Sequence, residues 1–472
     1  MRKIVIIGAG FGGLTTGYLL SNQGENVTII EHQRQPGGCL QSFYRNGLRF
    51  DTGLHYLGGL NTKGPLDYFF KKLGLTDLPW FKIANYQVHC GNKHYNIPCG
   101  HTEWLDYISA RFPNQKDELA RFIQTLKDII YCPISDTTKY WEQNAWEWLE
   151  ETITDPELRD VISGMSFILE LRKENLPLFA FAEILYSYFC SIHIMPTGGQ
   201  PIIDHLVKGI NANGGKIRCN ATAMQIMESD RQVTGVMLDT GEIIEADVVI
   251  SAINPTALMS MITENSCIRH VYRRRVKNLE CTLGCFTANL QLSDEYKIKN
   301  QDPIYIHKPG SDFWDMSTDD VTQVLIHFYK DQNAADIITP MSWESVKHWS
   351  DKPAGCRGED YVRFKERKLN ECLDLVETII PDFRKAIVNH WSSTPLTWKE
   401  YLLSPNGTAY GVRKDNNSLE TTLLYPRTPL SGLYLTGQSM ILHGIMGTTI
   451  SAFQTASFIN NNIKAWPTKE EL

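Results

Sequence analysis

Short runs of apolar residues flank an amphipathic stretch at the beginning of the chain. The runs Ile4 to Ile7 and Val27 to Ile30 are rich in β-branched residues, as buried parallel strands are. The spacing between them predicts a helix from about Phe11 to Asn22. The pattern therefore predicts that the chain begins with a βαβ unit.

Similar patterning returns later in the chain. A helix is predicted from about Pro201 to Asn213, followed by a β run around Lys216 to Ile226. Val233 to Leu238 has the pattern of a hairpin strand, and Ala246 to Ala252 that of a buried parallel strand. These segments are expected to belong to the same cofactor-binding domain as the first strands.

Two intervening regions lack this rhythm. From about Gly64 to Ser191 the chain predicts long amphipathic helices that are rich in aromatic residues. From roughly Met259 to Trp391, strands are predicted near Cys285 to Leu292 and Val324 to Tyr329, then a helix from about Tyr361 to Ile379. Both regions are expected to be insertions into the first fold.

Glycines occupy the turn after the first strand. Gly8 permits a tight turn, Gly10 lets the backbone approach a pyrophosphate, and Gly13 lets the helix pack close to the sheet. The helix directs its N-terminal amides at the phosphates, and Glu31, at the end of the second strand, can accept hydrogen bonds from a ribose. An acid at this place disfavours the 2′-phosphate of NADP. The alternative is a glycine-rich turn of an unrelated α/β domain. The predicted dinucleotide-binding residues are Gly8, Ala9, Gly10, Phe11, Gly12, Gly13, Glu31, His32, Gly37 and Gly38.

A second glycine-rich segment lies near the end of the chain. Gly432 to Gln438 predicts a strand, and His443-Gly444-Ile445-Met446-Gly447 leads into a helix expected to start near Gly447. One βαβ unit can hold a short dinucleotide, whereas an extended one such as FAD needs another segment for its far end. The two segments together predict that the protein binds FAD.

The expected fold class is α/β, with a Rossmann-like FAD-binding domain of mixed sheet and helices that is interleaved with an α+β substrate-binding domain. The predicted FAD-binding domain comprises residues 1–63, 192–258 and 392–472, and the predicted substrate-binding domain comprises residues 64–191 and 259–391.

Composition narrows the class of protein further. Of the 472 residues, 42% are apolar and 21% are charged, which is ordinary for a soluble protein of two or three domains. The net charge of −7 argues against a nucleic-acid partner. The eleven cysteines contain no CxxC pair, and the first strand leaves no room for a signal peptide, so a reduced, cytoplasmic protein is expected.

Two segments bear on contact with membranes and greasy molecules. Leu176 to Met195 is almost wholly apolar, with Glu183 as its one acidic residue. It predicts a buried core helix, with a wall of a cavity for an apolar substrate or a membrane span as alternatives. The basic run Arg269 to Lys277 predicts a solvated helix face, or peripheral docking to an anionic membrane.

With these motifs in view, the chain resembles the phytoene desaturase, carotenoid isomerase and retinol saturase group of FAD-dependent oxidoreductases. The resemblance is clearest in the cofactor segments, and the Gly53-Leu54-His55-Tyr56 run and the C-terminal motif make the retinol saturase branch the nearest. The segments that carry it include Gly8 to Gly13, Glu31, Gly37-Gly38, Asp51 to Tyr56, Gly198-Gly199, Gly407 to Gly411 and Gly432 to Gly447.

The resemblance also implies roles for single residues. Backbone at Ala223 would meet the adenine, and Gly437 would let the backbone approach the ribityl-phosphate. Many relatives have an aspartate after that glycine, whereas this chain has Gln438, whose amide can both donate and accept. The helix starting near Gly447-Thr448-Thr449 would direct its positive end at the flavin.

The implied reaction is saturation or desaturation of carbon–carbon double bonds in an apolar polyene or isoprenoid, by hydride transfer at flavin N5. His443 and His55 are the candidates for moving the accompanying proton, with structural hydrogen bonding as the alternative for each. Tyr56 and Tyr410 are expected to be packing residues near the ring. No metal-spaced cluster is present in the sequence.

The sequence leaves the redox partner and the protein class open. Since there is no second GxGxxG motif, electrons would come from transient NAD(P)H or another donor, or would leave to quinone or oxygen. Isomerisation without net redox change is a third possibility. A flavin amine oxidase-like enzyme and a non-enzymatic prenyl-lipid binder of the Rab GDP-dissociation-inhibitor kind are the alternatives from other classes.

Overall fold

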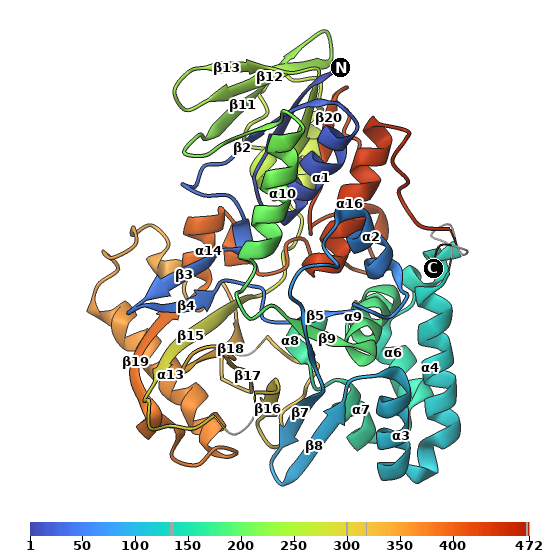
Figure 1. Cartoon of the computed structure of the whole chain (residues 1–472), viewed down its shortest axis with the longest axis vertical. Helices are drawn as coiled ribbons and strands as arrows, with labels where there is room; N and C mark the ends of the chain where they lie inside the picture. Colours follow the sequence, from blue (N-terminus) through green and yellow to red (C-terminus); the bar gives the residue numbers. More distant parts are fainter. Residues whose placement is uncertain (133–135, 299–300, 318, 469–470, 472) are drawn as a thin grey trace.

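Two sheets at opposite ends of an elongated molecule determine its architecture (Figure 1). The computed structural model describes residues 1–132, 136–298, 301–317, 319–468 and 471. In Figure 1 a five-stranded sheet lies in the upper half and a seven-stranded sheet in the lower half. This arrangement confirms the α/β class, and the segments of the upper sheet come from both ends and the middle of the chain.

The five-stranded sheet is wholly parallel. Its order is β10 (Lys216–Arg218), β2 (Asn26–Ile30), β1 (Lys3–Ile7), β14 (Val248–Ser251) and β20 (Leu433–Leu435). The register pairs Ile6 with Ile29 on one side and Ile250 on the other. The strands expected at the start of the chain, at Ala246 to Ala252 and near Leu433 are therefore confirmed.

The central strand β1 shows why this sheet is covered on both faces. Ile4 and Ile6 pack against the helices on one face of the sheet. Val5 and Ile7 pack on the other face, against the core of a second, smaller sheet. Successive side chains of a strand point to opposite faces, so a continuous apolar run is buried on both sides. The helices are α1 (Phe11–Asn22), α10 (Gln200–Ala212) and α16 (Gly444–Ile459), and the small antiparallel sheet is β11 (Ala223–Ser229), β12 (Gln232–Leu238) and β13 (Ile243–Glu245).

The predicted helices agree with α1 and α10 in place, but the last one begins earlier than expected. We predicted its start near Gly447, and α16 starts at Gly444. The prediction was wrong by less than a turn: Gly444 has φ of 70°, outside the right-handed helical region, and the regular helix follows it and already includes Gly447. Glycine is a weak helix former, so the sequence favoured the later start.

The seven-stranded sheet is mixed: β16 pairs parallel with β7, and its other pairs are antiparallel. The strands expected near Cys285, Val324 and the helix from Tyr361 are confirmed as β15, β17 and α13 (Glu359–Glu377). The order is β19 (Ile387–Ser393), β15 (Gly284–Leu292), β18 (Ala334–Met341), β17 (Gln323–Phe328), β16 (Ile304–His307), β7 (Asn85–Cys90) and β8 (Lys93–Pro98).

The hairpin of β7 and β8 lies in a region where we expected helices alone. That expectation was wrong, although Asn85 to Cys90 alternates polar and apolar residues, which is the period-two pattern of a half-buried strand. The pairing of β7 with β16 holds the hairpin in the sheet. The local pattern and the long-range pairing therefore agree on strands in this region.

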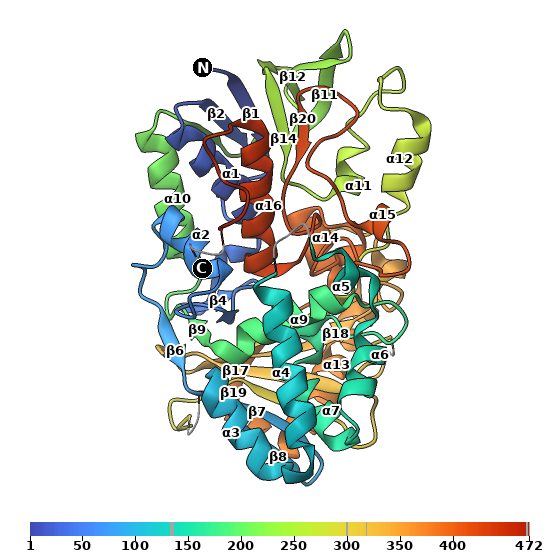
Figure 2. The ribbon, with the colours of Figure 1, turned by 90° about the vertical axis from the view of Figure 1, so that its right-hand side faces the viewer.

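Helices surround α9 (Leu178–Cys190) in the lower half, as Figure 2 shows. Eleven of its thirteen residues are buried, so the expected core helix at Leu176 to Met195 is confirmed. Among the described residues, none of the helices is long and apolar enough to cross a bilayer. The surrounding helices are α3 (His101–Arg111), α4 (Lys116–Ile130), α5 (Thr138–Glu142), α6 (Ala145–Thr152), α7 (Pro156–Ile162) and α8 (Ser166–Leu169), whereas α2 (Pro65–Leu73) packs against α1 and α16.

Small elements connect the two halves. One antiparallel sheet joins β5 (Leu57–Gly58), β9 (Ile192–Ile194) and β6 (Phe81–Ile83), and β3 (Ser42–Arg45) pairs with β4 (Leu48–Asp51). β6 and β9, which belong to different predicted domains, pair with each other. In addition, β19 spans the predicted boundary between residues 391 and 392. The exact division into domains stays a prediction.

Candidate active site

A cavity of about 380 Å³ lies at the carboxyl ends of the parallel strands. Gly8 follows β1, Glu31 follows β2, Ala252 follows β14 and Thr436 follows β20, and all four residues line it. Parallel strands end at one edge of their sheet, and ligands of such folds bind outside that edge. The topology therefore places the predicted glycine segments at a single cavity.

The first glycine segment has the geometry that a pyrophosphate needs. Gly8 has φ of 99°, and a side chain on Gly13 would overlap the carbonyl oxygen of Gly8. An added Cβ on Gly10 would meet no atom within 4 Å, so this backbone is open to the cavity. Helix α1 has no side-chain cap at Gly10 and no acid in its first turn, which leaves its amides free for an anion.

The C-terminal segment lies directly beside the first one. A Cβ on Gly12 would come within 3.1 Å of the Gly437 Cα atom and of the Thr448 side chain. Gly437 has φ of 109°, and helix α16 begins after His443 without a side-chain cap or an acid in its first turn. Two uncapped helix N-termini therefore meet at the cavity, and these residues fit an extended dinucleotide.

Glu31 is held by the backbone around it. Its carboxylate accepts hydrogen bonds from the amides of Ala9 (2.8 Å) and Gln33 (2.9 Å). His32 Nδ1 lies 3.0 Å from the same carboxylate. Burial raises the pKa of Glu31, but the hydrogen bonds from His32, Gln33 and Ala9 outweigh it, so the pKa is lowered. Glu31 is therefore a fixed anion at the cavity, suited to accept ribose hydroxyls.

The structure brings most of the predicted site residues to this cavity. Those that line it are Gly8, Gly10, Phe11, Gly12, Glu31, His32, Gly38, His55, Gly437, Gln438, His443 and Thr448. Those that are not among its lining residues are Ala9, Gly13, Gly37, Ala223, Gly447 and Thr449.

The predicted residues that do not line the cavity support the backbone of the segments that do. Gly37 has φ of 129° and donates its amide to Ala9, while a side chain on Gly447 would overlap Leu442. Thr449 donates to the carbonyl of Ile445 inside α16. Ala223 begins the small antiparallel sheet, so its role at the adenine stays a prediction.

Gln438 is oriented by a neighbouring loop. Its side-chain amide donates to the carbonyl oxygen of Ala409 at 3.2 Å. One of the two N–H groups is used in this bond, and the side-chain oxygen remains an acceptor at the cavity. An acceptor at this place is what an aspartate would also offer to a hydroxyl group.

His443 combines a structural hydrogen bond with a position on the cavity wall. Its Nε2 lies 2.9 Å from the carbonyl oxygen of Ile168, so Nε2 carries the hydrogen. Its ring lies 4.2 Å from that of Tyr410. Burial lowers the pKa of His443, which keeps the ring neutral. The remaining nitrogen, Nδ1, is then a proton acceptor.

His55 lies on another part of the wall, against a buried carboxyl group. Its Nδ1 is 3.6 Å from Asp336 Oδ2 and has no hydrogen-bond partner. Burial lowers the pKa of His55 to about 4 and raises that of Asp336 to about 7. Asp336 accepts hydrogen bonds from Tyr329 (2.6 Å) and Asn289 (2.7 Å). His55 is thus neutral, with a polar network behind it.

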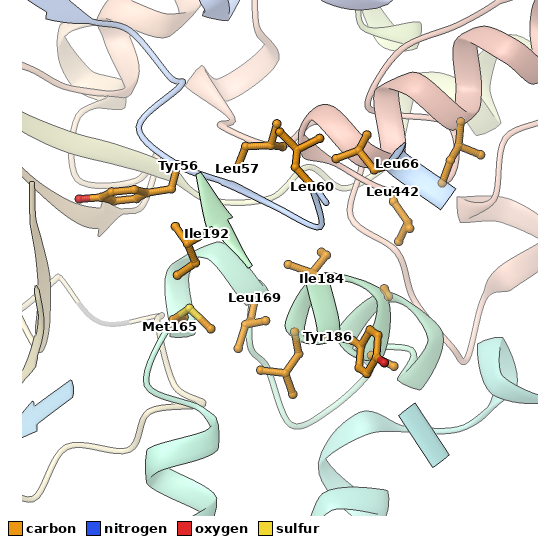
Figure 3. Packing of buried hydrophobic residues seen from close by; sticks show 14 of the residues in the cluster. Tyr56, Leu57, Leu60, Leu66, Met165, Leu169, Ile184, Tyr186, Ile192 and Leu442 are labelled. Atoms are coloured by element: carbon orange, nitrogen blue, oxygen red, sulfur yellow. The ribbon is translucent and has the colours of Figure 1, made fainter. Parts of the chain in front are cut away.

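The wall opposite the glycine segments is apolar and aromatic. Leu325 and Ile338 come from the seven-stranded sheet, whose other face is covered by α13. Ile184 and Tyr188 come from α9, and Figure 3 shows Ile184 pointing toward the segment that carries Leu57 and Leu60. Among the described residues that line the cavity, Glu31 is the one acidic side chain, and none is Lys or Arg.

Several lining residues escaped sequence reasoning. Asn254 follows the carboxyl end of β14, and the switch-point rule for parallel sheets could have indicated it. Trp398 and Tyr401 come from α14 (Pro395–Leu402), and Phe167 comes from α8. No local signal marks these three, because only packing brings them to the cavity.

Comparison with known proteins identifies the family. A family model described as flavin containing amine oxidoreductase matches residues 11–460. The chain belongs to this family. FAD is its cofactor, and the protein is an FAD-dependent oxidoreductase. This finding contradicts the alternative of a non-enzymatic lipid binder.

Curated relatives confirm the narrower resemblance. The chain is 22% identical to human all-trans-retinol 13,14-reductase over 97% of this chain and 85% of that protein. It is also 22% identical to the chloroplastic prolycopene isomerase of Daucus carota, over 92% of this chain and 76% of that protein. It thus resembles the oxidoreductases of carotenoids and retinol.

Solved structures show the same fold. An oxidoreductase from Methanosarcina mazei superposes with a TM-score of 0.67 at 20% identity, over 95% of this chain and 98% of that one. Wild-type putrescine oxidase bound to putrescine gives 0.66 at 15% identity, over 97% and 98% of the two chains. At these identities the likeness supports the fold alone.

Proposed function

We propose that this FAD-dependent oxidoreductase saturates or desaturates carbon–carbon double bonds of an apolar polyene or isoprenoid. The observation that carries the proposal is the cavity, which runs from the glycine segments to an apolar wall with Leu325, Ile338 and Ile184. A neutral hydrocarbon chain fits such a wall, since burying it costs no unpaired charge. The names of the retinol reductase and prolycopene isomerase relatives support the same substrate class.

The residues of the chain divide the remaining work. FAD, when bound, supplies or accepts the hydride. Gly10 and Gly437 would give the backbone close access to it, Gly12 lets the two glycine segments lie side by side, and Glu31 would hold its ribose. We assign His443 the proton transfer, because Nε2 is fixed by Ile168 and the neutral ring leaves Nδ1 free to accept a proton. The apolar wall excludes water.

His55 is the second candidate for the proton. Its low pKa of about 4 and its place beside Asp336 would let it pass a proton toward the buried polar network. The matched variants His443→Asn and His55→Asn separate the two. The residue that transfers the proton is the one whose variant keeps its full FAD content but no longer exchanges electrons between flavin and polyene, while the other variant still does.

The reaction itself is tested by an anaerobic screen. Purified protein is expected to release FAD near stoichiometry on denaturation. Reduced protein should be reoxidised by an all-trans polyene or retinoid, or oxidised protein should be reduced by one, which gives the direction of the reaction. Chromatography of products detects isomerisation without net redox change. NAD(P)H, quinone and oxygen are compared as redox partners in the same assay.

Putrescine and benzylamine serve as probes of the amine oxidase alternative. The described cavity lining contains no carboxylate beyond Glu31, which lies at the dinucleotide end, so an alkylammonium ion would be buried without a counter-ion. We therefore expect no flavin reduction by either amine. Rapid reduction by an amine, without any reaction of polyenes, would overturn the proposed function.

A further inference from the structure

A small side pocket of about 20 Å³ adjoins the main cavity. Ser187 of α9 and Met446 of α16 line both spaces, so the two are neighbours across these side chains. The pocket has room for about one water-sized group. Its lining is Gly59, Thr62, Gly64, Pro65, Ile130, Tyr131, Glu183, Tyr186, Ser187, Cys190 and Met446.

Glu183 is a buried carboxyl group without an assigned task. It is 2% exposed, lines the side pocket, and its Oε1 has no hydrogen-bond partner. Burial raises its pKa to about 8, so the group is protonated at neutral pH. An unsatisfied buried polar atom costs about 1–3 kcal/mol, which a ligand with a polar group would recover.

The geometry of α9 places the Glu183 carboxyl group beside Ser187, which lines both the side pocket and the main cavity. Glu183, Tyr186, Ser187 and Cys190 follow helical spacing and share one face of α9. Ile184, one position further, faces the main cavity instead. Ser187 and Met446 therefore lie between the main cavity and Glu183, and the end of a molecule lying along the cavity would meet these two side chains first.

The surroundings of Glu183 favour a neutral partner. Burial raises the pKa of Tyr131, Tyr186 and Cys190, the last to about 11, so these groups stay uncharged near neutral pH. None of the described residues that line the pocket is Lys or Arg. A protonated carboxyl group both donates and accepts, which matches a hydroxyl group.

We propose that Glu183 and this side pocket bind the terminal hydroxyl group of an elongated apolar substrate. This proposal rests on the proposed function for the identity of the chain, and it makes Glu183 a specificity-determining residue. The hydroxyl group fills a space of one water molecule, while the hydrocarbon stays in the main cavity. The site then selects its substrate by pairing the buried Glu183 carboxyl group with the substrate hydroxyl group. Analogues without the hydroxyl group would leave this carboxyl group unpaired and bind more weakly.

The test compares two ligands that differ in one oxygen atom. All-trans-retinol and deoxyretinol, in which a methyl group replaces CH2OH, are titrated into the FAD-loaded protein without a redox partner. Binding is measured by the change in ligand fluorescence. We expect the wild type to prefer retinol by about tenfold, the size of one hydrogen bond in a buried site.

Variants of Glu183 show whether this residue causes the preference. Glu183→Leu should reduce the ratio of the two dissociation constants to about one, without weakening deoxyretinol. Glu183→Gln keeps a donor and an acceptor and should retain most of the preference. Glu151→Leu, at an exposed position of α6, is the matched control and should leave the ratio unchanged. An unchanged ratio in Glu183→Leu overturns the proposal.

A second ligand pair keeps this result separate from the proposed function. 1-Dodecanol and dodecane carry no double bond, and their binding is followed by quenching of tryptophan fluorescence. If polyenes do not bind but dodecanol is preferred through Glu183, the substrate class is wrong and the hydroxyl site stands. If neither pair shows a Glu183-dependent preference, the pocket holds water alone and the proposal fails.

Discussion

Gly10 is a glycine that the fold does not require, so its role can be assigned to cofactor binding. The residue has φ of −71° and ψ of 177°, a conformation that any amino acid adopts. Nothing in the protein lies within 4 Å of where its Cβ would be. The glycine is therefore explained by the ligand side of the backbone. At Gly13, in contrast, the Gly8 carbonyl group occupies the space, so that glycine serves the fold.

We accordingly expect Gly10→Val to abolish retention of FAD by filling the approach to the pyrophosphate. The free energy of unfolding of the flavin-free protein should change by less than about 0.5 kcal/mol, because the added Cβ meets no protein atom within 4 Å. The measurements are FAD per protein after gel filtration and denaturant unfolding of the flavin-free form.

Gly13→Ala is the comparison variant, and it should destabilise the flavin-free protein as well, since its Cβ overlaps Gly8. A Gly10→Val protein that purifies with full FAD content would contradict the assignment of Gly10 to the pyrophosphate.

The buried carboxyl group of Glu183 also affects how stability depends on pH. Its pKa is raised from 4.5 in the unfolded chain to about 8 in the folded protein. Between these values the folded state holds the proton more tightly, so this group makes stability fall as pH rises from about 4.5 to about 8. The slope from one proton is at most about 1.4 kcal/mol per pH unit.

Glu183→Gln replaces the titratable carboxyl group, so this residue no longer contributes to the pH dependence of stability. The difference in unfolding free energy between variant and wild type should therefore grow in favour of the variant from pH 5 to pH 8, and level off above. Paired denaturant titrations at several pH values measure it. A difference that is independent of pH would show that Glu183 has an ordinary pKa.

Among the elements, α12 (His270–Lys277) is where the two interpretations of the basic run can be separated. Val276 is buried and anchors the helix, while Arg274 and Lys277 are exposed. Exposed cations at a helix C-terminus contribute a few tenths of a kcal/mol at most. The charges of Arg274 and Lys277 are therefore available for an external partner, whereas Arg273 donates to the carbonyl groups of Thr263 and Glu264.

The double variant Arg274→Gln/Lys277→Gln is expected to keep its FAD content and to change the unfolding free energy by less than about 1 kcal/mol. Cosedimentation with anionic and with neutral vesicles then distinguishes the alternatives. Binding to anionic vesicles that falls in the variant indicates docking, whereas absence of binding in both proteins indicates a solvated face. Loss of FAD would contradict the expectation for either alternative.

In the whole molecule, FAD connects segments that are far apart in the sequence. The cavity is lined by the N-terminal βαβ unit and by α16, so a bound dinucleotide would contact both ends of the chain. A ligand that binds only the folded state stabilises it by mass action, by about 2.7 kcal/mol at one hundred times its dissociation constant.

We therefore expect the melting temperature of the flavin-free protein to rise with added FAD, and to rise more steeply than with FMN, which lacks the adenosine half. Gly10→Val should show no such rise, since its approach to the pyrophosphate is filled. Differential scanning fluorimetry with both flavins measures this. An equal shift with FMN and FAD would argue that Glu31 and the first glycines do not hold the adenosine end.

Parts of this molecule that depend on neighbouring residues could be predicted from the sequence. The strands β1 and β2, helix α1 and the glycine turn at Gly8 follow from apolar runs, helical spacing and backbone freedom, all of which act over a few residues. The same holds for the predicted meeting of two glycine segments, since an FAD molecule requires it. The hairpin of β7 and β8 was missed although its alternation of polar and apolar residues is also local, whereas its pairing with β16 far along the chain has no local signal.

The sequence by itself thus predicted the dinucleotide fold, its cofactor and the two glycine segments and Glu31 that line the cavity. Only the tertiary structure decided that His55 lies against Asp336, that Trp398 covers the cavity, and that Glu183 faces a side pocket. Each of these pairs residues or elements far apart in the chain, and no local pattern encodes such a pairing. The physical reason is that long-range contacts follow from how whole elements pack, whereas helices, strands and glycine turns follow from the residues within them.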